Sequence, residues 1–186
     1  MFRRVIALLL LILAVQACMA EGPFVLDDAI GWDSTMEEVL EYFGDDVSIN
    51  THDGSGIVTV LKEHGRCCGI ETERMIVWFY EEEPFFMAFM YTEDHLDNKE
   101  DTLLELLSSY YGEAEISKPN AYTLEEYLEY MAGRTILWKW HCGSNTLIEV
   151  YKEANERDPD TWAYNVRVTN LERTERVNDT VYGSQG

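Results

Sequence analysis

Histidine and cysteine residues that lie close together are the residues of this chain best suited to chemistry. His64-Gly65-Arg66-Cys67-Cys68 forms one group, and His141-Cys142 forms another. Imidazole nitrogens and thiolates are ligands for zinc and copper, so the two groups could build a metal site or serve an enzyme. The alternatives are a structural disulfide, which an oxidising compartment favours, and buried thiols with no chemical role.

The disulfide is the interpretation that the spacing favours. Successive residues of a strand point to opposite faces, so only one of Cys67 and Cys68 can easily meet Cys142. We predict that Cys142 pairs with Cys67 or Cys68, which leaves one cysteine of the three over. A redox role as a dithiol commonly uses Cys-x-x-Cys, and the sequence lacks that motif.

Other catalytic motifs are absent from the sequence. It contains no Gly-x-Ser-x-Gly, no phosphate-binding loop and no His-Glu-x-x-His. Glu81-Glu82-Glu83 is typical of a solvated turn, since exposed acidic side chains are common. We therefore predict no catalytic residues, no metal and no cofactor, and expect that the protein is not an enzyme.

Helices and strands are predicted in the same order in both halves of the chain. In the first half, Ser34 and Glu37 predict a capping box that begins a helix, and Gly44 ends it. In the second half, an apolar stripe from Leu103 to Tyr111 predicts a helix, and the segment from Thr123 is either a short helix or extended. The predicted strands are Ile57–Leu61, Met75–Tyr80 and Phe85–Tyr91 in the first half, and Thr135–Cys142, Thr146–Tyr151 and Trp162–Thr169 in the second.

The order of these elements predicts one domain over residues 21–172. It has two α-β-β-β units, at about 28–94 and 95–172. Consecutive antiparallel strands with helices to one side give a two-layer α+β fold, in which the helices cover one face of the sheet. Residues 173–186 are polar and predict a flexible tail.

The stretch from Gly31 to Gly44, Gly-Trp-Asp-Ser-Thr-Met-Glu-Glu-Val-Leu-Glu-Tyr-Phe-Gly, resembles the opening of a repeat in small exported bacterial proteins. Leu107-Ser-Ser-Tyr-Tyr-Gly-Glu113 is similar to the end of a second copy. This loose superfamily includes small lipoproteins of the outer-membrane assembly machine and the β-lactamase inhibitor protein. The resemblance implies a non-enzymatic binding or scaffold module. The chain departs from the pattern after each closing glycine, where Asp45 and Glu113 stand instead of proline.

The N-terminus predicts export. Arg3 and Arg4 precede an apolar run from Val5 to Val15, and a short, mostly small stretch follows from Gln16 to Ala20. This order is typical of a secretory signal peptide over residues 1–20. Cleavage after Ala17 would instead leave Cys18 first, since Val15-Gln16-Ala17-Cys18 resembles a bacterial lipobox, and Cys18 would then carry a lipid anchor. Either way we expect an extracytoplasmic protein, periplasmic, secreted or lipid-anchored in the cell envelope.

The charge of the exported chain limits its partners. The chain after residue 20 carries 12 basic and 35 acidic residues, a net charge of −23. Such a surface repels nucleic acid and anionic membranes. We therefore exclude nucleic acid, and allow contact with a membrane only through a lipid at Cys18.

Two neighbouring strands of the first half are apolar at consecutive positions rather than at alternate ones. Met75–Tyr80 and Phe85–Tyr91 therefore have two apolar faces, and something must cover the second one. The cover is either another part of the chain, or another protein or second copy of this one. The outward set on the first strand is either Met75, Val77 and Phe79 or Ile76, Trp78 and Tyr80. For the binding surface we choose Met75, Val77, Phe79, Phe86 and Met90.

Overall fold

The computed structural model describes residues 25–26, 29–52, 54–96, 100–116, 134–154 and 160–183. The predicted signal peptide, Cys18 and the segment from Thr123, predicted as either a short helix or extended, lie outside these residues. Within the described part of the chain, no helix has the length and apolar character needed to span a membrane.

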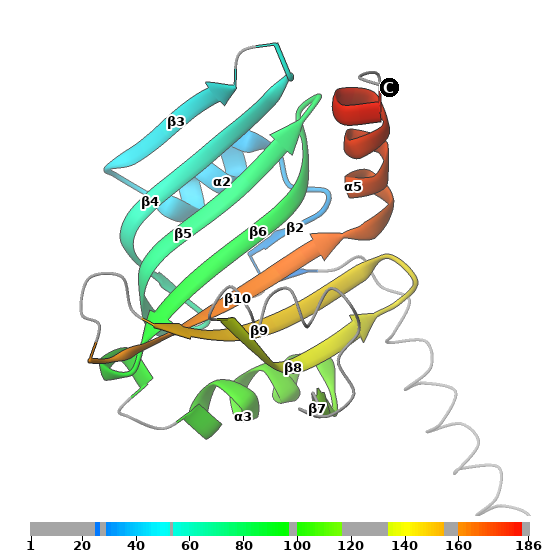
Figure 1. The fold of residues 1–186 in the computed structure, drawn as a ribbon. Coiled ribbons are helices and arrows are strands. Elements are labelled where there is room, and N and C mark those ends of the chain that lie inside the picture. The colour runs from blue at the N-terminus through cyan, green and yellow to red at the C-terminus, as the bar shows by residue number, and fades with distance from the viewer. Residues whose placement is uncertain are drawn as a thin grey trace, which may run out of the picture.

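A single antiparallel sheet of eight strands forms the centre of the molecule (Figure 1). The strands lie in the spatial order β3-β4-β5-β6-β10-β9-β8-β7. Their bounds are Val47–His52 (β3), Ile57–Cys67 (β4), Ile70–Tyr80 (β5), Glu83–Thr92 (β6), Glu115–Ile116 (β7), Arg134–Cys142 (β8), Thr146–Ala154 (β9) and Trp162–Asn170 (β10). A separate pair of short strands, β1 (Val25–Leu26) and β2 (Ile30–Gly31), precedes the sheet. The predicted α+β class with an antiparallel sheet is confirmed.

Within the described residues, each half of the chain has one helix that precedes four strands. Helix α2 (Met36–Phe43) precedes β3 to β6, and helix α3 (Glu100–Tyr111) precedes β7 to β10, with a single 3-10 turn, η1 (Asp94–Leu96), between the halves. The last strand of each half, β6 and β10, pair at the middle of the sheet. The predicted α-β-β-β units were thus one strand short.

Strand β3 is the element that the sequence analysis missed in the first half. Its residues, Val-Ser-Ile-Asn-Thr-His, are apolar only at alternate positions, and five of its six residues are exposed. Only Val47 of this edge strand packs against the core, so the strand needs few apolar side chains and its hydrophobic signal is weak.

Helix α2 begins one residue later than predicted. Thr35, not Ser34, is the N-cap, and the side chain of Glu38 accepts a hydrogen bond from the backbone of Thr35 in a capping box. This contact lowers the pKa of Glu38. Ser34 instead accepts a hydrogen bond from the backbone N–H of Gly31. Gly44 ends the helix at φ 70°, as expected for a residue without a Cβ.

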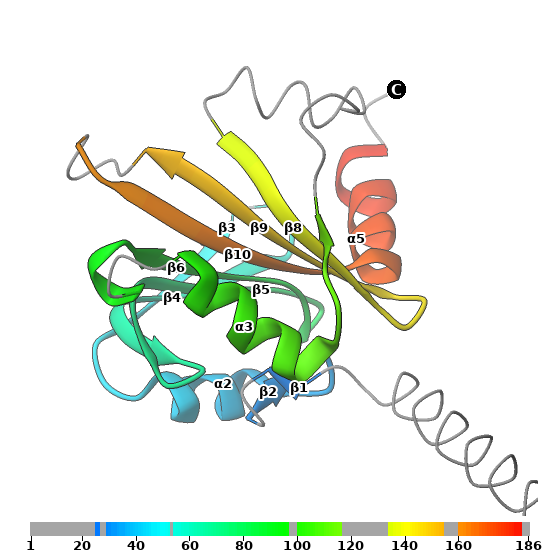
Figure 2. The same ribbon diagram turned by 90° about the horizontal axis from the view of Figure 1, so that it is seen from below.

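Helices α2 and α3 cover one face of the sheet, which we call the inner face (Figure 2). Buried side chains of both helices join the main hydrophobic core, among them Val39 and Phe43 of α2 and Leu103 and Leu107 of α3. The sheet contributes Val60, Met75, Val77, Phe79, Met87, Phe89, Trp138, Trp140, Ile148, Val150, Val166 and Val168. The tryptophans of β8, Trp138 and Trp140, are therefore core residues.

Helix α5 (Leu171–Val177) lies on the opposite, outer face and continues into a π-helical turn, η2 (Asn178–Tyr182). Val177 packs with Ile57, Tyr80 and Phe85 in a second apolar cluster, against which Val181 also lies. The predicted flexible tail from residue 173 is thus wrong as far as Tyr182. The prediction that all helices lie on one face of the sheet is also wrong. Two valines among polar residues, Val177 and Val181, are enough to dock this helix on the outer face.

Candidate functional site

Three of the five residues predicted to form a binding surface are in the core. Met75, Val77 and Phe79 are 1%, 0% and 0% exposed, so their assignment to an exposed surface is wrong. In the sheet register Met75 pairs with Phe89 and Val77 with Met87, which all point to the inner face beneath α2 and α3. Phe86 and Met90, the other two predicted residues, belong to the opposite face. The sequence could not assign the faces because both sets on β5 are equally apolar.

The outer face carries a half-exposed apolar surface, which we call the outer patch. Its members come from three neighbouring strands and are Leu61 of β4, Ile76 and Trp78 of β5, and Phe86 and Met90 of β6. Cross-strand pairing joins Leu61 to Ile76 and Trp78 to Phe86, which fixes them on one face. Trp78 is 38% exposed. The second of the two parities considered from sequence, with Ile76 and Trp78, is therefore the one that faces outward.

An irregularity in the pairing of β5 with β6 shapes the centre of this patch. The register shifts between Trp78 and Phe79, so that Trp78 pairs with Phe86 while Phe79 pairs with Pro84. Phe85 is therefore an extra residue on β6 that has no partner on β5. Such a β-bulge changes the direction in which the neighbouring side chains point. The Trp78 ring lies 4.8 Å from Phe86 and 6.0 Å from Phe85 between centroids. Three aromatic rings thus meet at the end of the patch that is nearest to α5.

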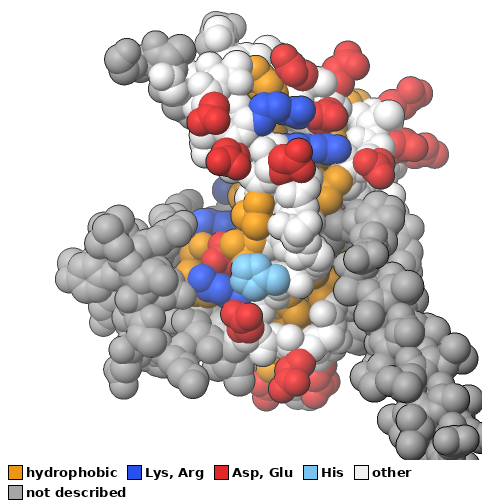
Figure 3. All heavy atoms as spheres, turned by 90° about the vertical axis from the view of Figure 1, so that its right-hand side faces the viewer, with side chains coloured by type: hydrophobic (Ala, Val, Ile, Leu, Met, Phe, Trp, Pro, Cys, Tyr) orange, Lys and Arg blue, Asp and Glu red, His pale blue; other side chains and the backbone are white. Residues whose placement is uncertain are grey.

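Helix α5 covers part of the outer apolar surface and leaves the patch open. Its Val177 buries Tyr80 and Phe85, and Phe86 is only partly covered by the same cluster. Arg173 holds the helix in place, because its Nη1 donates to the carbonyl oxygens of Trp32 and, at 3.0 Å, of Pro84. Seen from the side of α5, hydrophobic side chains reach the surface among acidic and basic ones (Figure 3).

The rim of the outer patch is polar and includes two arginines. Arg74, the cross-strand neighbour of Met90, forms a 3.1 Å ion pair with Glu63. Arg167, the neighbour of Ala88 on β10, lies over the Tyr151 ring at 4.2 Å from its centroid. Two cations therefore border the patch in a strongly acidic chain. An apolar centre with a polar rim is the usual composition of a protein-binding surface.

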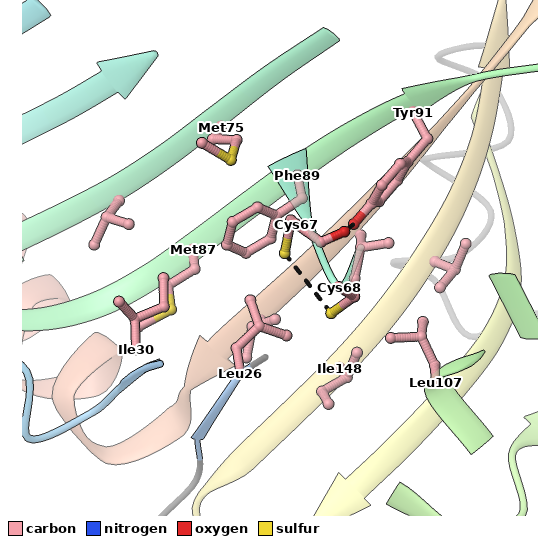
Figure 4. Packing of buried hydrophobic residues seen from close by; sticks show 14 of the residues in the cluster. Leu26, Ile30, Cys67, Cys68, Met75, Met87, Phe89, Tyr91, Leu107 and Ile148 are labelled. Atoms are coloured by element: carbon pink, nitrogen blue, oxygen red, sulfur yellow. Dashed lines mark hydrogen bonds between the residues drawn. The ribbon is translucent and has the colours of Figure 1, made fainter. Parts of the chain in front are cut away.

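The three described cysteines lie at the inner core, but the structure has them as thiols. The sulfur atoms of Cys67 and Cys68 are 3.8 Å apart (Figure 4), and Cys142 packs against the same core cluster. Cys68 and Gly69 form the two-residue turn between β4 and β5, both with positive φ. The disulfide from Cys142 to Cys67 or Cys68 is not formed in this structure and stays a prediction for the oxidised protein.

Cys142 is poorly suited to ionic chemistry. Burial raises the pKa of the Cys142 thiol to about 11. Burial, together with the nearby thiols, also raises the pKa of Tyr91 and of Tyr111. A thiol held protonated at neutral pH is a weak nucleophile and a weak metal ligand.

The two histidines of the predicted His/Cys cluster point away from the thiols. The His64 side chain is 68% exposed and lies 3.6 Å from Glu73, and His141 is exposed while Cys67 and Cys68 are buried. Among the residues that the structure describes, no three His, Cys, Asp or Glu side chains are placed to share a metal ion. The geometry therefore separates the groups that the alternative hypothesis of a metal site or active site would need together.

Comparison with known proteins identifies no relative of this chain. Protein-family models, curated proteins and solved structures each yield no match to this chain.

Proposed function

We propose that this protein is an exported, non-enzymatic binding or scaffold module of the cell envelope, and that its outer patch contacts another protein or a second copy of itself. The observation that carries the proposal is the exposure of Trp78, whose ring packs beside those of Phe86 and Phe85. Tryptophan and other rigid aromatic side chains dominate the energy of protein interfaces.

The surroundings of the patch support the same proposal. The half-exposed side chains of Leu61, Ile76 and Met90 extend the apolar area around Trp78, and methionine adapts readily to a partner. Isolated apolar residues on a surface need no explanation, whereas a contiguous group on three strands favours an interaction site. Arg74 and Arg167 at the rim can contact acidic or carbonyl groups of the partner.

Export is the second part of the proposal, and it rests on residues 1–20. A mature chain with a net charge of −23 would be well solvated outside the cytoplasm and would not bind nucleic acid. Intact-mass measurement of the exported protein tests this part: a chain that begins at Glu21, or at a diacylglycerol-modified Cys18, supports it. A chain that retains residues 1–17 would refute it.

The third part of the proposal concerns ancestry. In the described part of each half a helix precedes an antiparallel meander, and β6 and β10 meet at the centre as equivalent strands would. This arrangement supports two copies of one unit, in keeping with the resemblance to the small exported repeat proteins.

Site-specific crosslinking tests the binding function. A photoreactive amino acid replaces Trp78 in one variant and Leu171 in the control, because both side chains are apolar and exposed to a similar degree, 38% and 39%. Irradiation of intact cells should give a discrete adduct from position 78 and none from position 171. Adducts of equal yield from both positions, or none from position 78, would contradict the proposal.

A further inference from the structure

We propose that the free edge of β3 binds an extended, basic segment of a partner protein, which adds to the sheet as a further strand. The inference deepens the proposed function, since it names the chemistry of a partner, but it uses a different surface from the outer patch. Failure of one can therefore be told from failure of the other.

Strand β3 ends the sheet with a long and accessible edge. All six of its residues pair with β4, and no other strand of the described sheet lies on its far side. Ile49, near its middle, is 52% exposed on the inner face, opposite Val60. An edge of this kind presents backbone N–H and C=O groups that another strand can pair with.

The usual protections of an edge strand are missing from β3. Its sequence from Val47 to His52 has no lysine, no acidic residue and no proline, and its pairing with β4 runs without a bulge. The opposite edge of the sheet differs, because β7 is two residues long and contains Glu115. Short or charged edges avoid unwanted pairing, so the contrast marks β3 as the edge open to a partner.

Acidic residues lie at both ends of β3. Asp45 and Asp46 directly precede the strand and are exposed. At its other end His52 pairs with Ile57, which pairs with Tyr80, so the exposed Glu81 and Glu82 of the next turn lie at the same end of the sheet.

Cations are scarce beside this edge. Between Val47 and His52 on β3, and between Ile57 and Lys62 on β4 opposite it, Lys62 is the one Lys or Arg. Its Nζ donates to the carbonyl oxygen of Asp45. The edge is therefore a neutral strip within an acidic surface.

The acidic residues around β3 decide whether a second copy of this chain or a basic segment of another protein pairs with its edge. A second copy would bring its own acidic residues to both ends of β3, so like charges would meet. A segment with Lys or Arg at alternate positions places positive charge beside the acidic residues, while its apolar side chains on the inner face pack against Val47 and Ile49. Main-chain hydrogen bonds would supply affinity and the alternating side chains specificity.

A capped peptide of alternating valine and lysine, about eight residues long to span the strand, is the probe. Amide hydrogen exchange and calorimetric titration of the whole exported chain should show binding that slows exchange at β3. The same peptide with glutamate in place of lysine, or with alternate amides N-methylated, should not bind. Ile49→Lys and Thr51→Lys should each weaken binding by about tenfold or more, whereas the control Leu171→Lys should not.

The outcomes separate this inference from the proposed function. Unchanged peptide binding in Trp78→Ser supports a site distinct from the outer patch. Absence of binding, equal binding of the glutamate peptide, or protection confined to other strands overturns the inference. So does a dimer in sedimentation whose β3 amides are protected without peptide, because the occupant would then be a second copy.

Discussion

The indole ring of Trp78 lies against the ring of Phe86, its cross-strand neighbour, with centroids 4.8 Å apart. The next residue, Phe79, points to the other face and is fully buried. Trp78→Ser should therefore lower the free energy of unfolding by only about 1–2 kcal/mol, from the lost aromatic pair and partial burial. Phe79→Ala should cost about 3–5 kcal/mol, because it leaves a cavity in the core. Denaturant unfolding measures both, and equal losses would contradict the assignment of faces.

Arg173 should matter more to stability than Arg176, although both lie on α5. The Arg173 side chain is 19% exposed and donates to two backbone carbonyl oxygens, whereas that of Arg176 is 47% exposed and pairs with Glu83. Arg173→Met should reduce the free energy of unfolding by about 2 kcal/mol, since it leaves acceptors without their charged donor. Arg176→Met should reduce it by less than about 1 kcal/mol. The reverse order in denaturant titration would show that α5 is not held as described.

The reduced protein should lose stability in alkali through Cys142. Burial raises the pKa of this thiol to about 11, whereas an unfolded thiol ionises near pH ~8.5. Between these values the unfolded chain releases a proton that the folded chain keeps, so the free energy of unfolding falls as pH rises.

The expected loss is about 1 kcal/mol by pH ~11, discounted because water reaches this half-buried thiol. Unfolding with reductant present, compared between the wild type and Cys142→Ala, isolates the effect. An identical pH dependence in both proteins would show that Cys142 ionises as easily when folded as when unfolded.

The strands of the central sheet were largely predictable because their side chains are apolar over long runs. The predicted Thr135–Cys142 and Trp162–Thr169 each differ from the observed strand by one residue. Strand β3 and helix α5 were missed because their stability depends on neighbours. Edge pairing with β4 supports β3, and two valines with Arg173 support α5.

The strands that carry the candidate site were predictable, but the face of the sheet on which the site lies was not. Loss of alternation on β5 and β6 indicated a second apolar surface. Whether Val77 or Trp78 faced outward depends on which face α2 and α3 cover, and no local pattern encodes that choice. The bulge after Trp78, which gathers three aromatic rings, likewise arises from the pairing of two strands.

Oxidative footprinting of the tryptophans tests the central claim, that the outer patch is covered by a partner, most directly. Trp78 and Trp162 are 38% and 44% exposed, so hydroxyl radicals should modify them to similar extents in dilute purified protein. In the native envelope, the modification of Trp78 should fall severalfold while that of Trp162 stays as before. Equal modification of Trp78 in the envelope and in the purified protein would contradict the claim.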